Sequence, residues 1–502
     1  MQSLTYLLSE LSLYAKQNQL LREEDEAYVL NAWLTLCRAA EITDEKAPAS
    51  PRSLEEILSD ICERAAENGV LDRESITERD LFDTALMGAI TPRPSEVIDR
   101  FRALYKKSPA AATEDFYRMQ GLVNYIRTAR VQKDVKWQVE TPYGVMDMTI
   151  NLSKPEKDPK AIAAAKLQKS ALYPKCLLCH ECEGFAGDLT RPARQNLRQI
   201  PMTMAGKPWY LQYSPYVYYN EHCIALSAAH EPMRVDRDSF VKALDFVESF
   251  PHYFIGQNAD LPIVGGSILS HDHMQGGKYT FAMAKAPIKK EVRFAGFEGV
   301  KAGIVFWPMS VLRLESKKKE DLVCLADKIL AAWRAYSDES AEILSFSGNE
   351  PHNTITPIAR RVGKRFQLDL VLRNNRTTEE HPLGLFHPHA QLHNIKKENI
   401  GLIEVMGLAV LPARLKDEMA AVEEAILSGK DLAKDERTEK HAAWFNSFKD
   451  GYTFTEENTR KILFEEIGKT FVRVLEDAGV YKNTPEGDAA FLRFVDAVNG
   501  EK

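Results

Sequence analysis

The chain has 502 residues, of which 44% are hydrophobic and 27% charged, and its formal net charge at pH 7 is −7. This length leaves room for about three domains and a substantial core, which excludes wholesale disorder, a collagen-like chain and a small disulfide scaffold. The negative balance gives no support for a general nucleic-acid binder, although it leaves room for a local phosphate pocket.

The first 135 residues are predicted to form a helical extension. Leu4, Leu7, Leu8 and Leu11 repeat at the spacing of one buried helix face, and similar apolar patterns follow along this part of the chain. A packed helical extension is the plain interpretation, and an oligomerisation or regulatory arm is the alternative.

The N-terminus lacks the basic start, apolar run and cleavage site of a signal peptide. No stretch approaches the ~20 apolar residues that a membrane-spanning helix needs. We therefore expect a cytoplasmic protein without a membrane or nucleic-acid partner. The seven cysteines are few and odd in number, which in a reducing compartment favours buried thiols or metal ligands over disulfides.

Strands and helices mix in the middle of the chain without a strict βαβ rhythm, which favours an α+β fold. Helical spacing is clear in residues 238–250, and the chain becomes helical and charge-rich again after about residue 412. The segments that alternate like half-buried strands are residues 137–140, 146–150, 216–219 and 366–372.

Histidines point to the same middle region, because eleven of the 12 lie between His180 and His393. Just before His180 comes a C-x-x-C turn formed by Cys176 and Cys179, which brings two thiolates close enough to share one zinc ion. Zinc needs further ligands, for which Cys182, His180 and distant histidines are candidates. A redox pair and two buried thiols are the alternatives.

A glycine-flanked H-x-H-x-Q motif, His271-Asp272-His273-Met274-Gln275, is the strongest chemical signal. On a strand, alternate side chains would place both imidazoles and the amide on one face. One imidazole could attack or bind metal, and the glutamine could donate hydrogen bonds to an oxyanion. The alternative is a purely structural histidine pair.

Two further clusters are candidates. His387-Pro388-His389-Ala390-Gln391 repeats the H-x-H-x-Q pattern about 116 residues later, and an internal duplication explains it better than chance. Asn220 and Glu221 follow a predicted strand, where they could grip ribose hydroxyls or a base edge, or form an ordinary polar turn.

These motifs resemble those of the galactose-1-phosphate uridylyltransferases, in particular the second type found in bacteria. The likeness extends over most of the chain and includes the segment from Lys396 to Gly407. It implies two related α+β halves of the histidine-triad superfamily, a helical N-terminal extension and a helical C-terminal segment. The implied boundaries are 1–135, 136–290, 291–412 and 413–502.

The resemblance implies exchange of UMP between UDP-glucose and galactose 1-phosphate through a covalent uridylyl-histidine, and a possible homodimer. The implied roles are nucleophile for His273, phosphoryl contact for Gln275, substrate binding for Asn220, Glu221, Asn258 and Ser267 (with Ser270 as a competitor), and zinc binding for Cys176, Cys179, His230 and His271. His352, His387 and His389 resemble a second metal-binding set only loosely.

The nucleophile has a rival, because the family's usual motif is H-P-H-x-Q and Asp272 replaces the proline in the first copy. The second copy has Pro388, which alone would favour His389. The order in which the motifs follow one another along the chain favours His273, in the first copy. There are two rival functions. The first is a dinucleoside polyphosphate phosphorylase or hydrolase of the same superfamily, which a sugar-phosphate exchange assay would distinguish from a uridylyltransferase. The second is a non-enzymatic zinc-stabilised nucleotide-binding module, which covalent labelling by UDP-glucose would distinguish.

Overall fold

The computed structural model describes residues 2–39, 45, 48–153, 173–266 and 268–500. The N-terminal extension is helical, as predicted. Ser3 caps the first helix by accepting a hydrogen bond from the Tyr6 amide, and Ser53 and Glu56 form a capping box at the third. Its helices are α1 (Leu4–Gln17), α2 (Glu26–Leu36), α3 (Leu54–Glu67), α4 (Ile76–Gly88), α5 (Pro94–Tyr105), α6 (Pro109–Leu122) and α7 (Thr128–Val131).

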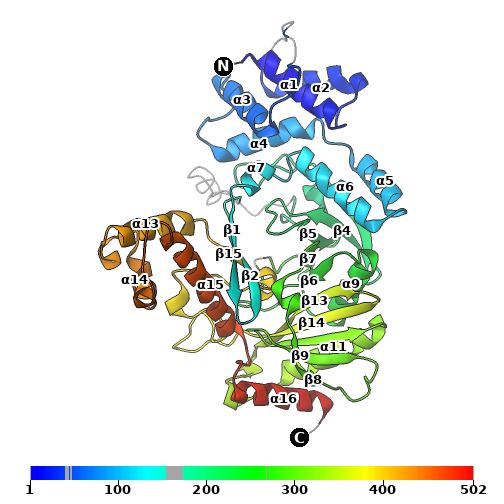
Figure 1. Ribbon diagram of the computed structural model, residues 1–502. Coiled ribbons are helices and arrows are strands. Elements are labelled where there is room, and N and C mark those ends of the chain that lie inside the picture. Colours follow the sequence, from blue (N-terminus) through cyan, green and yellow to red (C-terminus); the bar gives the residue numbers. More distant parts are fainter. Residues whose placement is uncertain (1, 40–44, 46–47, 154–172, 267, 501–502) are drawn as a thin grey trace.

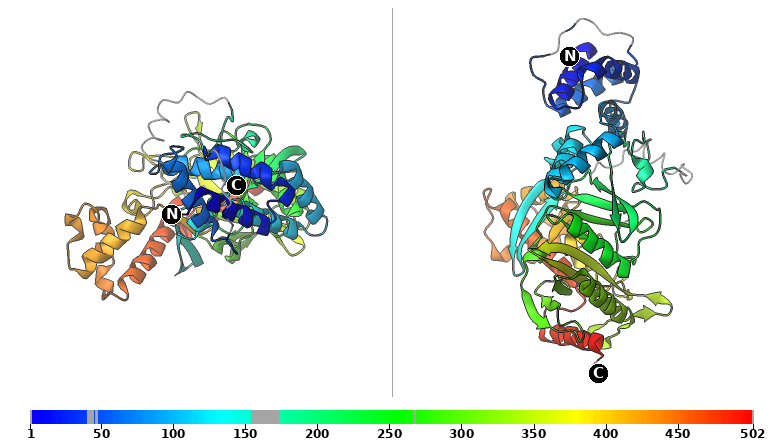
Figure 2. Two further views of the ribbon diagram at one scale, coloured as in Figure 1. Left: turned by 90° about the horizontal axis from the view of Figure 1, so that it is seen from above. Right: turned by 90° about the vertical axis from the view of Figure 1, so that its right-hand side faces the viewer.

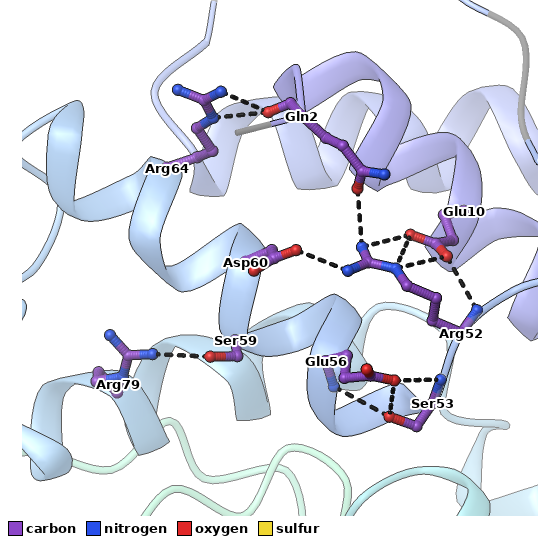
Figure 3. A network of polar contacts seen from close by, with 9 residues as sticks. All are labelled: Gln2, Glu10, Arg52, Ser53, Glu56, Ser59, Asp60, Arg64 and Arg79. Atoms are coloured by element: carbon purple, nitrogen blue, oxygen red, sulfur yellow. Dashed lines mark hydrogen bonds and ion pairs between the residues drawn. The ribbon is translucent and has the colours of Figure 1, made fainter.

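The buried carboxylate of Glu10 on α1 is at the centre of a polar network within this extension (Figure 3). The Arg52 guanidinium lies 2.8 Å from Glu10 and also contacts Asp60 on α3 at 2.9 Å. Arg52 therefore links α1 to α3 through its contact with the buried carboxylate of Glu10.

A small three-stranded sheet follows, with strand order β1-β2-β15. The strands β1 (Val135–Thr141) and β2 (Gly144–Ile150) form an antiparallel hairpin, and β15 (Leu408–Leu411) joins β2 in parallel. The strands predicted at residues 137–140 and 146–150 are thereby confirmed.

The described residues also form a ten-stranded sheet, in the order β3-β4-β5-β7-β6-β13-β14-β10-β9-β8. Two helices, α9 (Arg237–Ser249) and α11 (Lys319–Ala335), lie against it and contact each other. The strands are β3 (Ile200–Met204), β4 (Lys207–Tyr213), β5 (Cys223–Ser227), β6 (Phe254–Gly256), β7 (His273–Gly277), β8 (Ile288–Val292), β9 (Lys301–Val305), β10 (Val311–Ser316), β13 (Asn353–Val362) and β14 (Arg365–Asn374).

This sheet contains the same five-stranded unit twice. In chain order, each unit has three strands, one helix and two more strands, and the last strand inserts next to the third, giving β3-β4-β5-β7-β6 and β8-β9-β10-β14-β13. The units meet where β6 pairs with β13, with Gly256 opposite Ile358. The fold is therefore α+β, with two halves built on the same five-stranded unit.

The two faces of this sheet have different partners. Met274 of β7 and Leu370 of β14 belong to the core that also contains Phe246 of α9 and Ile329 of α11. Alternate residues such as Val371 point to the opposite face, which packs on the three-stranded sheet. We call this opposite face the site face.

The C-terminal segment is helical, as predicted, and α13–α15 project to one side of the molecule (Figures 1 and 2). Helix α16 lies at the end of the molecule opposite to α1–α4. The remaining helices and strands are α10 (Ala282–Lys285), β11 (Phe346–Ser347), β12 (Glu350–Pro351), α12 (Leu402–Val405), α13 (Leu415–Leu427), α14 (Glu439–Asn446), α15 (Thr459–Ala478) and α16 (Pro485–Asn499).

One predicted strand is wrong. Residues 216–219 form turns rather than a strand, and Val217 has a positive φ of 41°. Their alternating aromatic pattern has another cause, because the Tyr219 ring packs on Phe254 and Phe281 while Tyr218 lies beside His222. Consequently Asn220 and Glu221 lie in a turn that precedes β5.

Candidate functional site

Two cysteines and two histidines converge at one end of β7. The Sγ atoms of Cys176 and Cys179 are 3.7 Å apart. The Nδ1 atom of His271 lies 3.3 Å from Cys176 Sγ and 3.8 Å from Cys179 Sγ, and the Nδ1 atom of His230 lies 3.2 Å from Cys179 Sγ. All four ligand atoms lie within 4.8 Å of one another.

This geometry fits one tetrahedral metal ion. Ligands at ordinary zinc bond lengths would place two sulfurs roughly 3.8 Å apart and a sulfur and a nitrogen roughly 3.6 Å apart. The Nε2 atom of His271 donates to the Ser227 carbonyl at 2.8 Å, which turns Nδ1 toward the cysteines. The four residues therefore form a possible metal-binding cluster.

The other ligand candidates near the C-x-x-C turn are engaged elsewhere. The thiol of Cys182 donates to the Cys176 carbonyl at 3.2 Å. The His180 ring stacks on Tyr210 and its Nδ1 contacts Gln199 Oε1 at 2.6 Å. Cys176 and Cys179 are free cysteines in the structure.

His273 is the first residue of β7, and only 7% of it is exposed. Its Nδ1 donates to the His271 carbonyl at 2.8 Å, whereas its Nε2 makes no hydrogen bond to any part of the chain that the structure describes. Burial lowers the pKa of His273 below its ordinary value. The ring therefore favours the neutral form, in which Nε2 carries a lone pair.

Gln275 shares the site face with His273, because the two residues alternate with the core residue Met274 along β7. The prediction that the motif forms a strand holds for this pair, while His271 lies in a bend just before the strand. The Nε2 atom of His222 lies 3.1 Å from Gln275 Oε1. With that oxygen engaged, the amide nitrogen of Gln275 is free of described hydrogen-bond partners.

The predicted substrate-binding pair splits into an exposed and a buried residue. Asn220 is exposed and lines a cavity of about 470 Å³, together with Tyr117, Trp137 and Tyr218. Glu221 is 4% exposed, and its carboxylate accepts a hydrogen bond from the Tyr253 hydroxyl. The two side chains therefore have different surroundings.

Asn258 lies just beyond β6, the strand next to β7. Its Oδ1 accepts from the Leu402 amide at 2.9 Å, so the segment around α12 docks on it. A Cβ atom on Gly266 would lie 2.6 Å from Asn258 Nδ2, which explains glycine at this close approach. Ser267 lies outside the described residues, and Ser270 is exposed in a bend.

The second H-x-H-x-Q motif is not on β14, which is the strand equivalent to β7. It precedes and enters the short 3-10 turn Ala390–Leu392. Both ring nitrogens of His389 are engaged, because Nε2 contacts the Leu385 carbonyl at 3.0 Å and Nδ1 lies 3.6 Å from the Asp477 carboxylate. This contrasts with Nε2 of His273, which has no partner in the part of the chain that the structure describes.

The loosely expected second metal set is not assembled. His352 contacts Asn375 and Ser347, and His387 contacts Asn399. Over residues 2–39, 45, 48–153, 173–266 and 268–500, the one potential metal cluster is that of Cys176, Cys179, His230 and His271.

The sequence alone missed three side chains next to the motif. His222 contacts Gln275, and Lys242 and Gln257 contact Asp272. The one available signal was Asp272 itself, an acidic residue between two histidines where the second motif has proline.

The duplicated unit defines an α+β class of protein with two similar halves in one sheet. A solved structure of yeast Ap4A phosphorylase Apa2 is similar over 63% of this chain and 96% of its own, with 14% identity and a TM-score of 0.31. That score is too low to support an argument about function.

Sequence comparison is decisive for the family. The profile described as galactose-1-phosphate uridyl transferase, N-terminal domain, matches residues 21–232, and the corresponding C-terminal domain profile matches residues 246–446. The chain therefore belongs to the galactose-1-phosphate uridylyltransferase family.

Close relatives carry that name. The galactose-1-phosphate uridylyltransferase of Fusobacterium nucleatum subsp. nucleatum is 52% identical, over 98% of this chain and 99% of the relative. That of Bacillus subtilis (strain 168) is 49% identical over 98% of both chains. That of Halalkalibacterium halodurans is 55% identical over 88% of both. Among the described residues, no helix has the length and apolar character needed to cross a membrane.

Proposed function

We propose that the protein transfers a uridylyl group from UDP-glucose to galactose 1-phosphate through a covalent bond to His273. The observation that carries this proposal is the neutral imidazole of His273, whose Nε2, like the amide nitrogen of Gln275 on the same face, has no partner among the described residues. The names of the relatives support the choice of substrates.

The reaction runs in two displacements. The Nε2 lone pair of His273 attacks the α-phosphorus of UDP-glucose, and the bond from that phosphorus to the bridging oxygen breaks, so that glucose 1-phosphate leaves. A phosphate oxygen of galactose 1-phosphate then attacks the same phosphorus, forming UDP-galactose and restoring His273. The Gln275 amide donates to the α-phosphoryl oxygens, and positioning with charge stabilisation supplies most of the catalysis.

We propose zinc as the metal held by Cys176, Cys179, His230 and His271. Four protein ligands of the Cys2His2 type make a closed structural site, and bound zinc would fix the geometry of these ligands. The chain's own contribution is to hold the imidazole of His271, and with it the carbonyl that orients His273.

We propose that the cavity beside Asn220 receives the nucleoside. Its volume of about 470 Å³ lies in the range of small-ligand sites, and tyrosine and tryptophan side chains offer surfaces for a base. Glu221 would have to leave the Tyr253 hydroxyl to reach a ribose hydroxyl. Asn258 and Ser267 are proposed substrate contacts, Ser267 to a phosphate.

The remaining proposals concern organisation. We propose the domains 1–135, 136–290, 291–412 and 413–502, and a homodimer in solution. Light scattering at several protein concentrations tests the dimer, and a constant monomer mass would contradict it.

Initial-rate kinetics test the proposed function. Rates measured against UDP-glucose at several fixed concentrations of galactose 1-phosphate should give parallel double-reciprocal lines, because each substrate meets a different enzyme form. Lines that intersect at all concentrations would contradict the covalent route.

A further inference from the structure

Asp272 stands between the metal-ligand candidate and the proposed nucleophile, and its carboxylate is buried. One oxygen lies 2.7 Å from Lys242 Nζ, and the other accepts a hydrogen bond from Gln257 Nε2 at 3.0 Å. The Lys242 and Asp272 side chains are only 7% and 8% exposed. Lys242 belongs to α9, and its ammonium also lies 5.3 Å from the centre of the Trp209 ring.

The backbone of Asp272 is held as firmly as its side chain. Its N–H donates to the Glu231 carbonyl at 2.7 Å, and its carbonyl accepts from the Ser227 amide at 2.9 Å. Proline at this position would remove the donor to Glu231. The chain therefore holds this residue by hydrogen bonds and an ion pair, whereas the second motif has the fixed ring of Pro388.

The peptide between His271 and Asp272 links this anchor to the proposed nucleophile. Its carbonyl oxygen accepts the hydrogen bond from His273 Nδ1, so the orientation of the peptide sets the direction of Nε2. A rotation of this peptide would turn the attacking atom away from an in-line approach to phosphorus.

We propose that Lys242 and Asp272 are positioning residues for the nucleophile. Their ion pair fixes the peptide whose carbonyl orients the His273 imidazole. This inference rests on the proposed function. It predicts that loss of the pair slows attack on UDP-glucose while leaving the affinity for UDP-glucose and the bound metal nearly unchanged.

The test measures how fast the uridylylated protein forms after rapid mixing with saturating UDP-glucose alone, using quenched samples and intact-protein mass spectrometry. Lys242→Met should slow this step by ~10–100-fold, which is typical when a group supporting a functional ligand is removed. The dissociation constant of UDP-glucose and the metal content should stay within about threefold, and Lys242→Arg, which keeps the cation, should restore most of the rate.

Two further variants keep the test decisive. Lys242→Met with Asp272→Asn removes both charges, so it avoids an unpaired buried carboxylate and should fold while remaining slow. Arg52→Met breaks the Arg52–Glu10 pair of the N-terminal extension and should leave adduct formation unchanged. Wild-type rates in both Lys242→Met proteins would overturn the positioning role. Absence of adduct in the wild-type protein would overturn the proposed function and this inference with it.

Discussion

The two five-stranded units have one strand order and different site faces. In the first unit this face carries His273 and Gln275, with one imidazole nitrogen and one amide nitrogen unengaged by described residues. In the second unit it carries Asp369, which is fully buried and bonded to Arg313 at 2.8 Å and to Arg360 at 2.8 Å. Among the described residues, the first face leaves these two nitrogens without a partner, and the second pairs its buried carboxylate with two guanidiniums.

Charge balance distinguishes the second face. Burial would raise the pKa of Asp369, and the guanidiniums of Arg360 and Arg313 outweigh it and hold that pKa below its usual value. Arg313 also donates to the carbonyls of Met283 and Ala286, on the segment that covers the face. The comparison indicates that the same face of a duplicated unit can pair its charges internally in one copy and leave polar nitrogens without described partners in the other.

The largest expected effect on activity follows from removing the imidazole of His273 in the first unit. His273→Gly should abolish the covalent adduct and lower sugar-phosphate exchange by more than about 10⁴-fold, because the whole covalent route is lost. Free imidazole should fill the cavity and attack UDP-glucose, giving uridylyl-imidazole in solution.

His389→Gly is the matched control, because both nitrogens of His389 are already engaged. It should keep the adduct, with a loss of activity no greater than about 10–100-fold. An adduct retained by His273→Gly and lost by His389→Gly would reverse the assignment of the two motifs.

The next effect concerns the metal cluster, which only the first unit has among the described residues. Cys176→Ser should lower stoichiometric zinc and reduce the Tm by more than about 10 °C, because binding energy at a structural zinc site is folding energy. Metal analysis and calorimetry measure both. Cys324→Ser, at an exposed free cysteine, should change neither, and wild-type protein purified without chelators yet lacking zinc would contradict the zinc assignment.

A change in the second unit should affect stability and spare chemistry. Asp369→Asn removes the charge that balances Arg313 and Arg360, which should lower the unfolding free energy by ~3–5 kcal/mol. Denaturant unfolding measures this loss. At temperatures where the variant is folded, the rate of adduct formation should stay near the wild-type value, and a selective loss of that rate would show that the second face takes part in the chemistry.

Among the variants expected to lower activity, the smallest loss comes from changing His222, which contacts Gln275 Oε1. His222→Phe should lower kcat/KM about tenfold, because the Gln275 amide loses the partner that fixes its orientation. His180→Phe, which keeps the stack on Tyr210, is the matched control and should stay within about twofold. Equal kcat/KM for both variants would remove the role of His222.

The same residue predicts a pH dependence of stability. Burial lowers the pKa of His222 from 6.5 to about 4. Between these values the unfolded chain binds the extra proton, so this contribution to stability is present above pH 6.5 and is lost as the pH falls toward 4. Over that window the unfolding free energy of wild type should fall more steeply than that of His222→Phe, by up to ~1.4 kcal/mol per pH unit. Urea unfolding at several pH values measures these free energies. The same change of unfolding free energy with pH in both proteins would contradict this prediction.

Local periodicity predicted much of the fold. The spacing of Leu4, Leu7, Leu8 and Leu11 predicted α1, and the alternation in residues 366–372 predicted β14, because one buried face imposes its period on the sequence. Residues 216–219 show where this fails. Aromatic side chains that pack around turns can alternate as they do in a strand.

Short motifs were a less reliable guide to the position of a residue in the fold than the strand order around them. The two H-x-H-x-Q copies suggested equivalent positions in a duplicated fold, and the duplication is present in the strand order. The second copy lies after β14 instead of within it, so its similarity to the first does not reflect an equivalent place in the fold.

Long-range contacts could not be predicted from one sequence. Lys242 and Asp272 are 30 positions apart, and their pairing depends on how α9 lies against β7. The contact between His222 and Gln275 likewise depends on the register that places Ile224 opposite Gln275. Neither the angle of a helix on a sheet nor a strand register is written in local spacing.

The central claim is that His273 of the first unit carries the uridylyl group. The most direct measurement is intact-protein mass spectrometry after mixing with UDP-glucose alone, followed by peptide mapping at neutral to alkaline pH. We predict one added uridylyl group per chain, located on His273, and its discharge on adding galactose 1-phosphate. An unmodified chain that still exchanges sugar phosphates, or an adduct located on His389, would contradict the account.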